Sequence, residues 1–221
     1  MVPQGDTIYR SALFAHGRQP RSELKKEGNK MMIFKGRITS VGFDTGNSIV
    51  IGDWNESPLG DFTNIMWSKP DGTRVLLSPS QEHADFVSSL YSFDEVSIIN
   101  FETKRHKRSV EVISDRFSVS ARWGYRLVIP ISRPLWFISS IENFFGKIIF
   151  GSSTYGIARD GSKEWYSIRG ISKVTSAEAR YLEQDLGNIT STDFPKKFGF
   201  SSPPRIPSSI EVRSHIDRDK V

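Results

Sequence analysis

Two carboxylates beside a tryptophan are the first residues in this chain that could do chemistry. Asp53 directly precedes Trp54, and Asp61 opens the next apolar run. An apolar ring raises the pKa of a neighbouring carboxyl, so the two acids could bind a sugar or form an acid/base pair. The alternative is structural, with Asp53 and Asn55 capping turns through side-chain to backbone hydrogen bonds. We predict that Asp53 and Trp54 lie in an irregular loop over residues 52–60.

A lysine pair near the C-terminal end is the second candidate. The run Phe194-Pro195-Lys196-Lys197-Phe198-Gly199-Phe200 resembles the Pro-Lys-Lys-hydrophobic-Gly-aromatic segment of acetoacetate decarboxylases. In these β-rich enzymes adjacent lysines lower the pKa of one amine, which can then form a Schiff base. The resemblance implies Lys197 as the nucleophile, but it covers only this short segment. The competing interpretation is a solvated lysine pair in a Pro-rich exit segment.

Histidine and cysteine offer little metal or nucleophile chemistry. The chain has no cysteine, which excludes a disulfide framework, a thiolate zinc site and a cysteine nucleophile. The four histidines are scattered along the chain at His16, His83, His106 and His215. Metal sites need clustered ligands, so we predict no metal site and see no signal for a cofactor.

Large apolar side chains suggest a binding pocket instead. Bent sheets and barrel mouths form concave apolar sites. Our first functional hypothesis is therefore a non-enzymatic module that binds a small apolar or amphipathic molecule. The same residue types also fill ordinary cores. The residues that we expect to line such a pocket are Trp54, Met66, Trp67, Trp136 and Trp165.

Strands and one short helix would position these residues. Residues 62–67 and 74–77 read as two strands of a hairpin around the turn at residues 70–72. Ser78 then fits the cap of a short helix over residues 79–91. That helix places three apolar residues on one flank, namely Ala84, Val87 and Leu90.

A longer amphipathic helix is expected over residues 134–149, where aromatic and aliphatic residues recur at intervals of three and four. It is too short and too polar to span a bilayer. The helix could cover the apolar face of a sheet or act as a lid over the pocket. It could also lie in the plane of a membrane.

The predicted fold class is α+β, predominantly antiparallel β, with a strongly bent sheet or partly closed barrel covered by one short and one long amphipathic helix. Residues 1–30 are expected to be a flexible extension, and residues 31–200 a single β-rich domain. Residues 201–221 read as a Pro/Ser-rich tail with one short strand at 210–212. Residues 174–186 fit either helix or strand.

The charge distribution bears on partners. The formal net charge is +5, and residues 1–30 contribute more than half of it. The remaining chain is close to neutral, which argues against a nucleic-acid partner. The second hypothesis is an enzyme that uses Lys197 or one of the acids Asp53 and Asp61. The third hypothesis, a peripheral membrane or nucleic-acid binder, would use residues 1–30 and the basic run 104–108. The simpler interpretation of 104–108 is an exposed hairpin tip. No apolar run of secretory length occurs, and we expect a soluble cytoplasmic protein.

Six short segments spread along the chain together resemble an uncharacterised bacterial protein family of similar length. No activity is established for that family, so the resemblance implies none. It fits a start at Met31 or Met32. The segments are Gly36-Arg37-Ile38, Ser57-Pro58-Leu59-Gly60, Pro70-Asp71-Gly72 with Val75-Leu76-Leu77, Tyr91-Ser92-Phe93-Asp94-Glu95-Val96, Glu164-Trp165-Tyr166 and Phe198-Gly199-Phe200.

Overall fold

The computed structural model describes residues 31–128, 155–200 and 202–218, which form mainly β-strands. In chain order the elements are β1 (Met32–Phe43), β2 (Ser48–Glu56), β3 (Phe62–Ser68), β4 (Arg74–Ser78), α1 (Gln81–Leu90), β5 (Glu95–Ile98), β6 (Glu102–His106), β7 (Ser109–Ile113), β8 (Phe117–Trp123), β9 (Leu127–Val128), β10 (Tyr155–Ile157), β11 (Lys163–Tyr181), β12 (Gln184–Asp185), β13 (Ile189–Thr190) and β14 (Ser208–Asp217).

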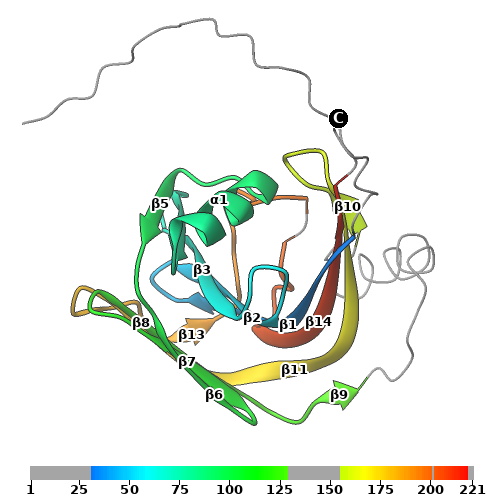
Figure 1. Ribbon diagram of the computed structural model, residues 1–221. Helices are drawn as coiled ribbons and strands as arrows, with labels where there is room; N and C mark the ends of the chain where they lie inside the picture. Colours follow the sequence, from blue (N-terminus) through cyan, green and yellow to red (C-terminus); the bar gives the residue numbers. More distant parts are fainter. Residues whose placement is uncertain (1–30, 129–154, 201, 219–221) are drawn as a thin grey trace, which may run out of the picture.

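The long strands belong to one curled sheet in the order β5-β4-β3-β2-β1-β14-β11-β8-β7-β6. Neighbours in this order pair antiparallel, except that β4 and β5 are parallel. The sheet curls into a half-barrel, with β6 to β8 turned over towards β2 and β3 (Figure 1). At the meeting point, the Thr103 hydroxyl of β6 lies 3.0 Å from the Thr63 hydroxyl of β3. The predicted bent, predominantly antiparallel sheet is confirmed, while the described residues contain one helix rather than two.

Alternation of side chains along the strands gives the sheet an apolar core on each face. The inner core joins residues of β1 to β4 with residues of β7, β8 and β11, including Phe43, Ile51, Val112 and Phe117. A smaller core on the opposite face packs Phe34, Phe62 and Leu76 against Ala84, Val87 and Leu90 of α1. Each face of the sheet therefore has its own packed core.

The short helix forms with the predicted buried flank but begins later than expected. Ser80, not Ser78, is the N-cap, and its hydroxyl accepts a hydrogen bond from the His83 backbone N–H at 3.3 Å. Ser78 cannot serve because it is the last residue of β4, where its backbone pairs with Ile98. The predicted flank of Ala84, Val87 and Leu90 is buried.

Two strand boundaries correct the sequence interpretation. β2 continues to Glu56, so Asp53 and Trp54 lie in a strand instead of a loop. They stay extended because Asp53 pairs with Arg37 on one side and Thr63 on the other. β14 is a ten-residue strand in the middle of the sheet, between β1 and β11, where the sequence suggested a tail with one short strand. Its serines are tolerated because their hydroxyls find partners, as Ser209 Oγ does with Thr39 Oγ1 at 2.8 Å.

The ambiguous stretch from residue 174 begins as strand, since β11 runs to Tyr181. Bulges at 168/170 and 174/176 bend this nineteen-residue strand, which pairs with β14 along its first half and β8 along its second. The predicted helix over 134–149 and the predicted extension over 1–30 lie outside the described residues. Within the described ranges no helix has the length and apolar character needed to cross a membrane.

Candidate functional site

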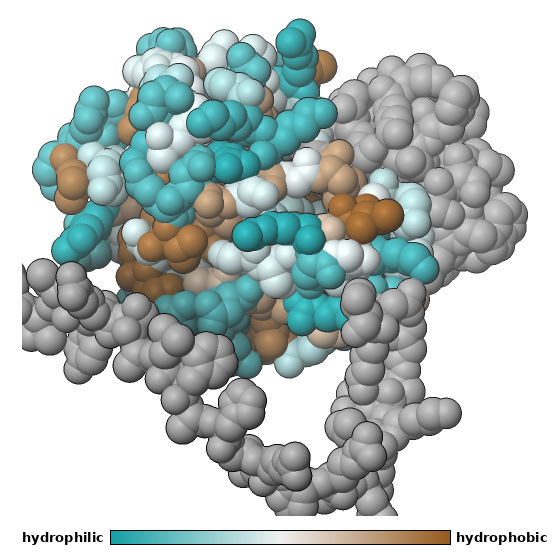
Figure 2. Space-filling view, turned by 90° about the horizontal axis from the view of Figure 1, so that it is seen from above, coloured by the Kyte–Doolittle hydropathy of each residue, from teal (hydrophilic) through white to brown (hydrophobic). Residues whose placement is uncertain are grey.

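An apolar cavity lies between the sheet and α1, on the face opposite the inner core. Its volume is about 140 Å³. β1, β2, β3, β11 and β14 supply the sheet side, while α1, Phe198 and residues 202–204 cover it. Seen from above, apolar residues reach the molecular surface between polar ones (Figure 2). Apolar lining residues include Phe34, Ile38, Val50, Trp54, Phe62, Met66, Phe86, Val87, Phe198, Ile210 and Ile216.

One carboxylate is buried in this apolar lining. Glu164 on β11 is 2% exposed. Its Oε1 accepts hydrogen bonds from the Tyr91 hydroxyl at 3.0 Å and the Ser214 hydroxyl at 3.0 Å, and Tyr91 also reaches Oε2 at 2.8 Å. The hydroxyl of Tyr166 lies 2.5 Å from that of Tyr91. All four side chains line the cavity, so a polar cluster interrupts a largely apolar wall.

Strand register and a close backbone approach hold this cluster together. Glu164 pairs with Ile216 and Tyr166 with Ser214, so these side chains share one face of β11 and β14. Tyr91 arrives from the end of α1, where the Ser92 N–H donates to the Phe198 carbonyl at 2.7 Å. Any Cβ on residue 199 would lie 2.8 Å from the Tyr91 ring. Glycine at 199 therefore lets the ring pack against this segment.

The cluster has perturbed acidity. Burial raises the pKa of Glu164 to about 6, although hydrogen bonds from Tyr91, Tyr166 and Ser214 favour the charged form. Burial and the nearby carboxylate raise the pKa of both phenols well above the ordinary value, so Tyr91 and Tyr166 stay protonated near neutral pH. Glu164 is mostly ionised at neutral pH but close to titration. It can accept a hydrogen bond from a ligand or exchange a proton with one.

The predicted pocket residues divide between the two faces. Trp54 and Met66 line the cavity, and the Trp54 indole N–H donates to Asn64 Oδ1 at 3.3 Å. Trp67 lies in the inner core instead, where its indole N–H donates to Asn47 at 2.8 Å. Trp165 is outside the cavity lining, and its ring packs 5.4 Å from that of Tyr155. Trp136 lies outside the described residues.

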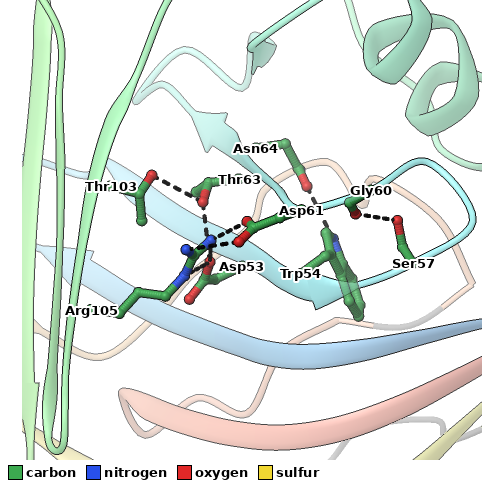
Figure 3. Close-up of polar contacts among 9 residues, drawn as sticks. All are labelled: Asp53, Trp54, Ser57, Gly60, Asp61, Thr63, Asn64, Thr103 and Arg105. Carbon is green, nitrogen blue, oxygen red and sulfur yellow. Dashed lines mark hydrogen bonds and ion pairs between the residues drawn. The ribbon is translucent and has the colours of Figure 1, made fainter.

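The two candidate acids, Asp53 and Asp61, are brought together by an arginine (Figure 3). Arg105 of β6 donates from Nε to Asp53 at 2.8 Å and from Nη1 to Asp61 at 3.1 Å. Thr63 adds a hydrogen bond to Asp53 at 3.1 Å. Trp54 follows Asp53 in β2 and so faces the opposite side of the sheet, away from the acids. One guanidinium thus engages both candidate acids and links β6 to β2.

The candidate nucleophile Lys197 lies on the surface. Its side chain is exposed and is not among the residues that line the cavity, although the next residue, Phe198, is. Its carbonyl accepts a hydrogen bond from Arg74 at 3.2 Å.

Sequence reasoning missed Glu164, Tyr91 and Tyr166 as functional candidates. The spacing of Glu164 and Tyr166 does place them on one face of a strand. No local sequence pattern indicates that Tyr91 and α1 cover that face.

As for metals, no group of three or more His, Asp or Glu side chains is placed to hold an ion within residues 31–128, 155–200 and 202–218.

No protein-family model and no curated protein matches the chain. Among solved structures, an acetoacetate decarboxylase from Legionella pneumophila is similar with a TM-score of 0.39 and 10% sequence identity, over 86% of this chain and 85% of that chain. A likeness at this level transfers neither a site nor a reaction.

Proposed function

We propose that this chain binds a small, largely apolar molecule carrying one hydrogen-bond donor, a hydroxyl or an amine, in the cavity beneath α1. The observation that carries the proposal is the buried carboxylate of Glu164 in an apolar wall. Burying an ionised group is costly, and strongly perturbed carboxyls in cavities are typical of functional sites.

The size of the cavity limits the ligand. Its volume of about 140 Å³ is close to that of the engineered apolar cavity of about 150 Å³ that binds benzene. A single ring or a short branched chain fills such a space. Larger ligands would have to extend beyond the enclosed part.

The hydrogen-bond inventory sets the polarity of the ligand. The two oxygens of an ionised carboxylate offer about four lone-pair sites. Tyr91, Tyr166 and Ser214 each carry one hydroxyl proton, so these three donors fill at most three of the sites. Acceptor capacity therefore remains for a donor on the ligand, and a protonated amine would also gain from the negative charge.

Binding of three probes of nearly equal shape tests the proposal. Benzyl alcohol and benzylamine should perturb cavity-residue resonances at lower concentration than ethylbenzene in NMR titrations near pH 7.5, because only the first two can donate to Glu164. Glu164→Gln should remove the preference for benzylamine. Glu178→Gln is the matched control, since Glu178 lies on the same strand and is exposed. Absence of binding by all three probes, or an unchanged preference after Glu164→Gln, would refute the assignment.

A second candidate function, proton transfer, follows from the pKa of Glu164 near 6. A carboxylate that titrates near neutrality is suited to act as a general base, and a phenol beside it could polarise a carbonyl. Deuterium exchange into phenylacetone in D₂O would be followed by NMR. The protein-dependent rate should rise as pH passes 6 and disappear in Glu164→Gln. Exchange that matches the buffer rate would eliminate this candidate.

Two other hypotheses remain separate from the cavity. A Schiff-base enzyme at Lys197 would need a desolvated amine, and this side chain is exposed. Borohydride trapping with a keto acid tests this hypothesis, and the absence of a trapped adduct would eliminate it.

A membrane or nucleic-acid binder through residues 1–30 and 104–108 would use Arg105, which is already paired with two acids. Binding that persists after deletion of both segments would remove that proposal.

A further inference from the structure

A polar cleft lies on the other face of β1 and β14, opposite the apolar cavity. Its volume is about 620 Å³, which is within the usual range for small-molecule sites. Val212 borders both spaces. The cleft is lined by six cationic side chains, Lys35, Arg37, Arg105, Arg126, Arg169 and Arg213, and by three acids, Asp53, Glu56 and Glu211.

Only part of this positive charge is paired. Lys35 pairs with Glu56, and Arg105 with Asp53. Arg37 and Arg126 share one carboxylate oxygen of Glu211, at 3.4 Å and 2.9 Å.

Arg169 and Arg213 differ from the other cations of the cleft. Across the part of the chain that the structure describes, neither guanidinium forms an ion pair with a carboxylate. Burial and the nearby Arg126 lower the pKa of Arg37, while Glu211 and Asp53 oppose this, which shows how crowded these cations are.

Three buried polar atoms at or near these arginines have no hydrogen-bond partner within the described ranges, namely Arg213 Nε, Ser167 Oγ and His215 Nδ1. Of these three residues, Arg213 lines the cleft, while Ser167 and His215 do not. Ser167 pairs with Arg213 across β11 and β14, and His215 follows two residues along β14. The three side chains therefore share one face. Each can donate a hydrogen bond, and such groups are normally satisfied in native structures.

A backbone irregularity makes room for the arginines. The bulge between Ile168 and Gly170 lies in the strand that carries Arg169. A Cβ at residue 170 would lie 2.3 Å from Arg126 Nε, so only glycine lets the Arg126 side chain cross the strand. Arg126 Nη2 then donates to the Arg169 carbonyl at 3.3 Å. The chain thus brings several guanidinium groups to one place.

We propose that this cleft binds a small organic phosphate, held chiefly by Arg169 and Arg213, with Arg37 and Arg126 beside them. Guanidinium groups match phosphate oxygens in charge and in bidentate geometry. A bound phosphate would neutralise the unpaired charge and accept a hydrogen bond from Arg213 Nε, which has no partner among the described residues. The ring of Trp123, already covered by Arg37 at 4.8 Å, gives the cleft an apolar side for the organic part.

Calorimetric titration of the full chain with phenyl phosphate, at fixed ionic strength, tests the proposal. Inorganic phosphate and a single-stranded oligonucleotide are parallel titrants. We expect phenyl phosphate to bind more tightly than inorganic phosphate. Arg169→Gln combined with Arg213→Gln should weaken the binding at least about tenfold. Arg116→Gln combined with Arg180→Gln removes the same charge from exposed positions outside the cleft and should leave binding unchanged.

Melting temperatures measured with and without phenyl phosphate test the proposal even if binding is weak. Without phosphate, Arg213→Gln should raise the melting temperature, because it relieves repulsion between unpaired cations. With phenyl phosphate, the wild type should gain stability and the Arg169/Arg213 double variant should not. Equal losses in both double variants would indicate nonspecific attraction and overturn the proposal. So would no binding of phenyl phosphate by the folded wild type, or tighter binding of the oligonucleotide than of phenyl phosphate that Arg169→Gln and Arg213→Gln abolish.

Discussion

The cavity beneath α1 and the arginine cleft lie on opposite faces of the same strands. The cavity holds a buried negative charge, whereas the cleft holds an excess of positive charge. In the cavity, one buried carboxylate receives hydrogen bonds from Tyr91 and Ser214. In the cleft, guanidinium groups outnumber the carboxylates, and the buried Nε of Arg213 has no acceptor among the described residues. Ser214 and Arg213 are adjacent in sequence yet serve different sites. The alternation of a strand is sufficient to keep two chemistries apart on a single sheet.

Two arginines that line the cleft, Arg105 and Arg213, differ in whether a carboxylate pairs with the guanidinium. Arg105 contacts Asp53 and Asp61, and the hydrogen bond that it donates to Asp53 raises its pKa. Arg213 lines the same cleft without such a partner. Arg105 therefore has a structural role in holding β6 against β2, while Arg213 is suited to contact a ligand.

Phe34→Ala should have the largest effect and should act only on the cavity side. Phe34 is 2% exposed, and its ring stacks on Phe86 at 5.0 Å. Its removal should cost about 3–5 kcal/mol of unfolding free energy and enlarge the cavity. Urea denaturation measures the loss. Ile33→Ala, at the neighbouring and 39% exposed residue, should change stability by about 0.5 kcal/mol or less. Loss of phenyl phosphate affinity in folded Phe34→Ala would show that the two sites are not independent.

Glu164→Gln should change how stability depends on pH. The pKa of Glu164 is raised from 4.5 to about 6 in the folded protein, so the folded state favours the protonated form. The resulting stabilisation is complete below the unfolded pKa and is lost as pH rises through the folded pKa. It corresponds to roughly 2 kcal/mol between about pH 4 and pH 7.

The measurement is the difference in unfolding free energy between wild type and variant at several pH values. Relative to Glu164→Gln, the wild type should lose about 2 kcal/mol over this range. The exposed-site control, Glu178→Gln, should give a flat difference. A flat difference for Glu164→Gln as well would mean that burial does not perturb this carboxyl.

Arg105→Ala should have a smaller effect, because the pair is partly solvated. The Arg105 side chain is 37% exposed and that of Asp53 is 12% exposed. Loss of the arginine leaves Asp53 with the hydrogen bond from Thr63 and no close ion pair among the described residues, and should cost about 1–2 kcal/mol, less than for a fully buried pair. Lys104→Ala on the same strand, where the side chain is 48% exposed, should cost about 0.5 kcal/mol or less. Equal costs would show that the Arg105 contacts contribute nothing specific.

Local patterns predicted the parts of the fold that depend on local interactions. The hairpin of β3 and β4 and the buried flank of α1 follow from turn residues and apolar spacing. β14 was underestimated because serines at 208, 209 and 214 are typical of turns and caps, and only its neighbours in the sheet satisfy them.

The sites could not be predicted in the same way. Alternation shows that Glu164 and Tyr166 share a face, but not that this face is buried. The covering residue, Tyr91, lies 73 positions away from Glu164 in the sequence. For the same reason, the basic run at 104–108 drew attention to Arg105, whereas the unpaired Arg169 and Arg213 stood in separate strands and gave no local signal.

The smallest expected effect concerns His215 and connects the cleft to a group that NMR can observe. Burial lowers the pKa of His215, and the charges of Arg213 and Arg169 lower it further. Arg213→Gln removes one of these charges, so the pKa should rise while the contribution of burial remains. Phenyl phosphate bound beside the arginines should also raise the pKa in the wild type, and this rise should be smaller in the variant. Arg116→Gln, remote from the cleft, should leave the titration unchanged. If phenyl phosphate shifts the His215 titration equally in wild type and Arg213→Gln, the phosphate does not bind next to Arg213.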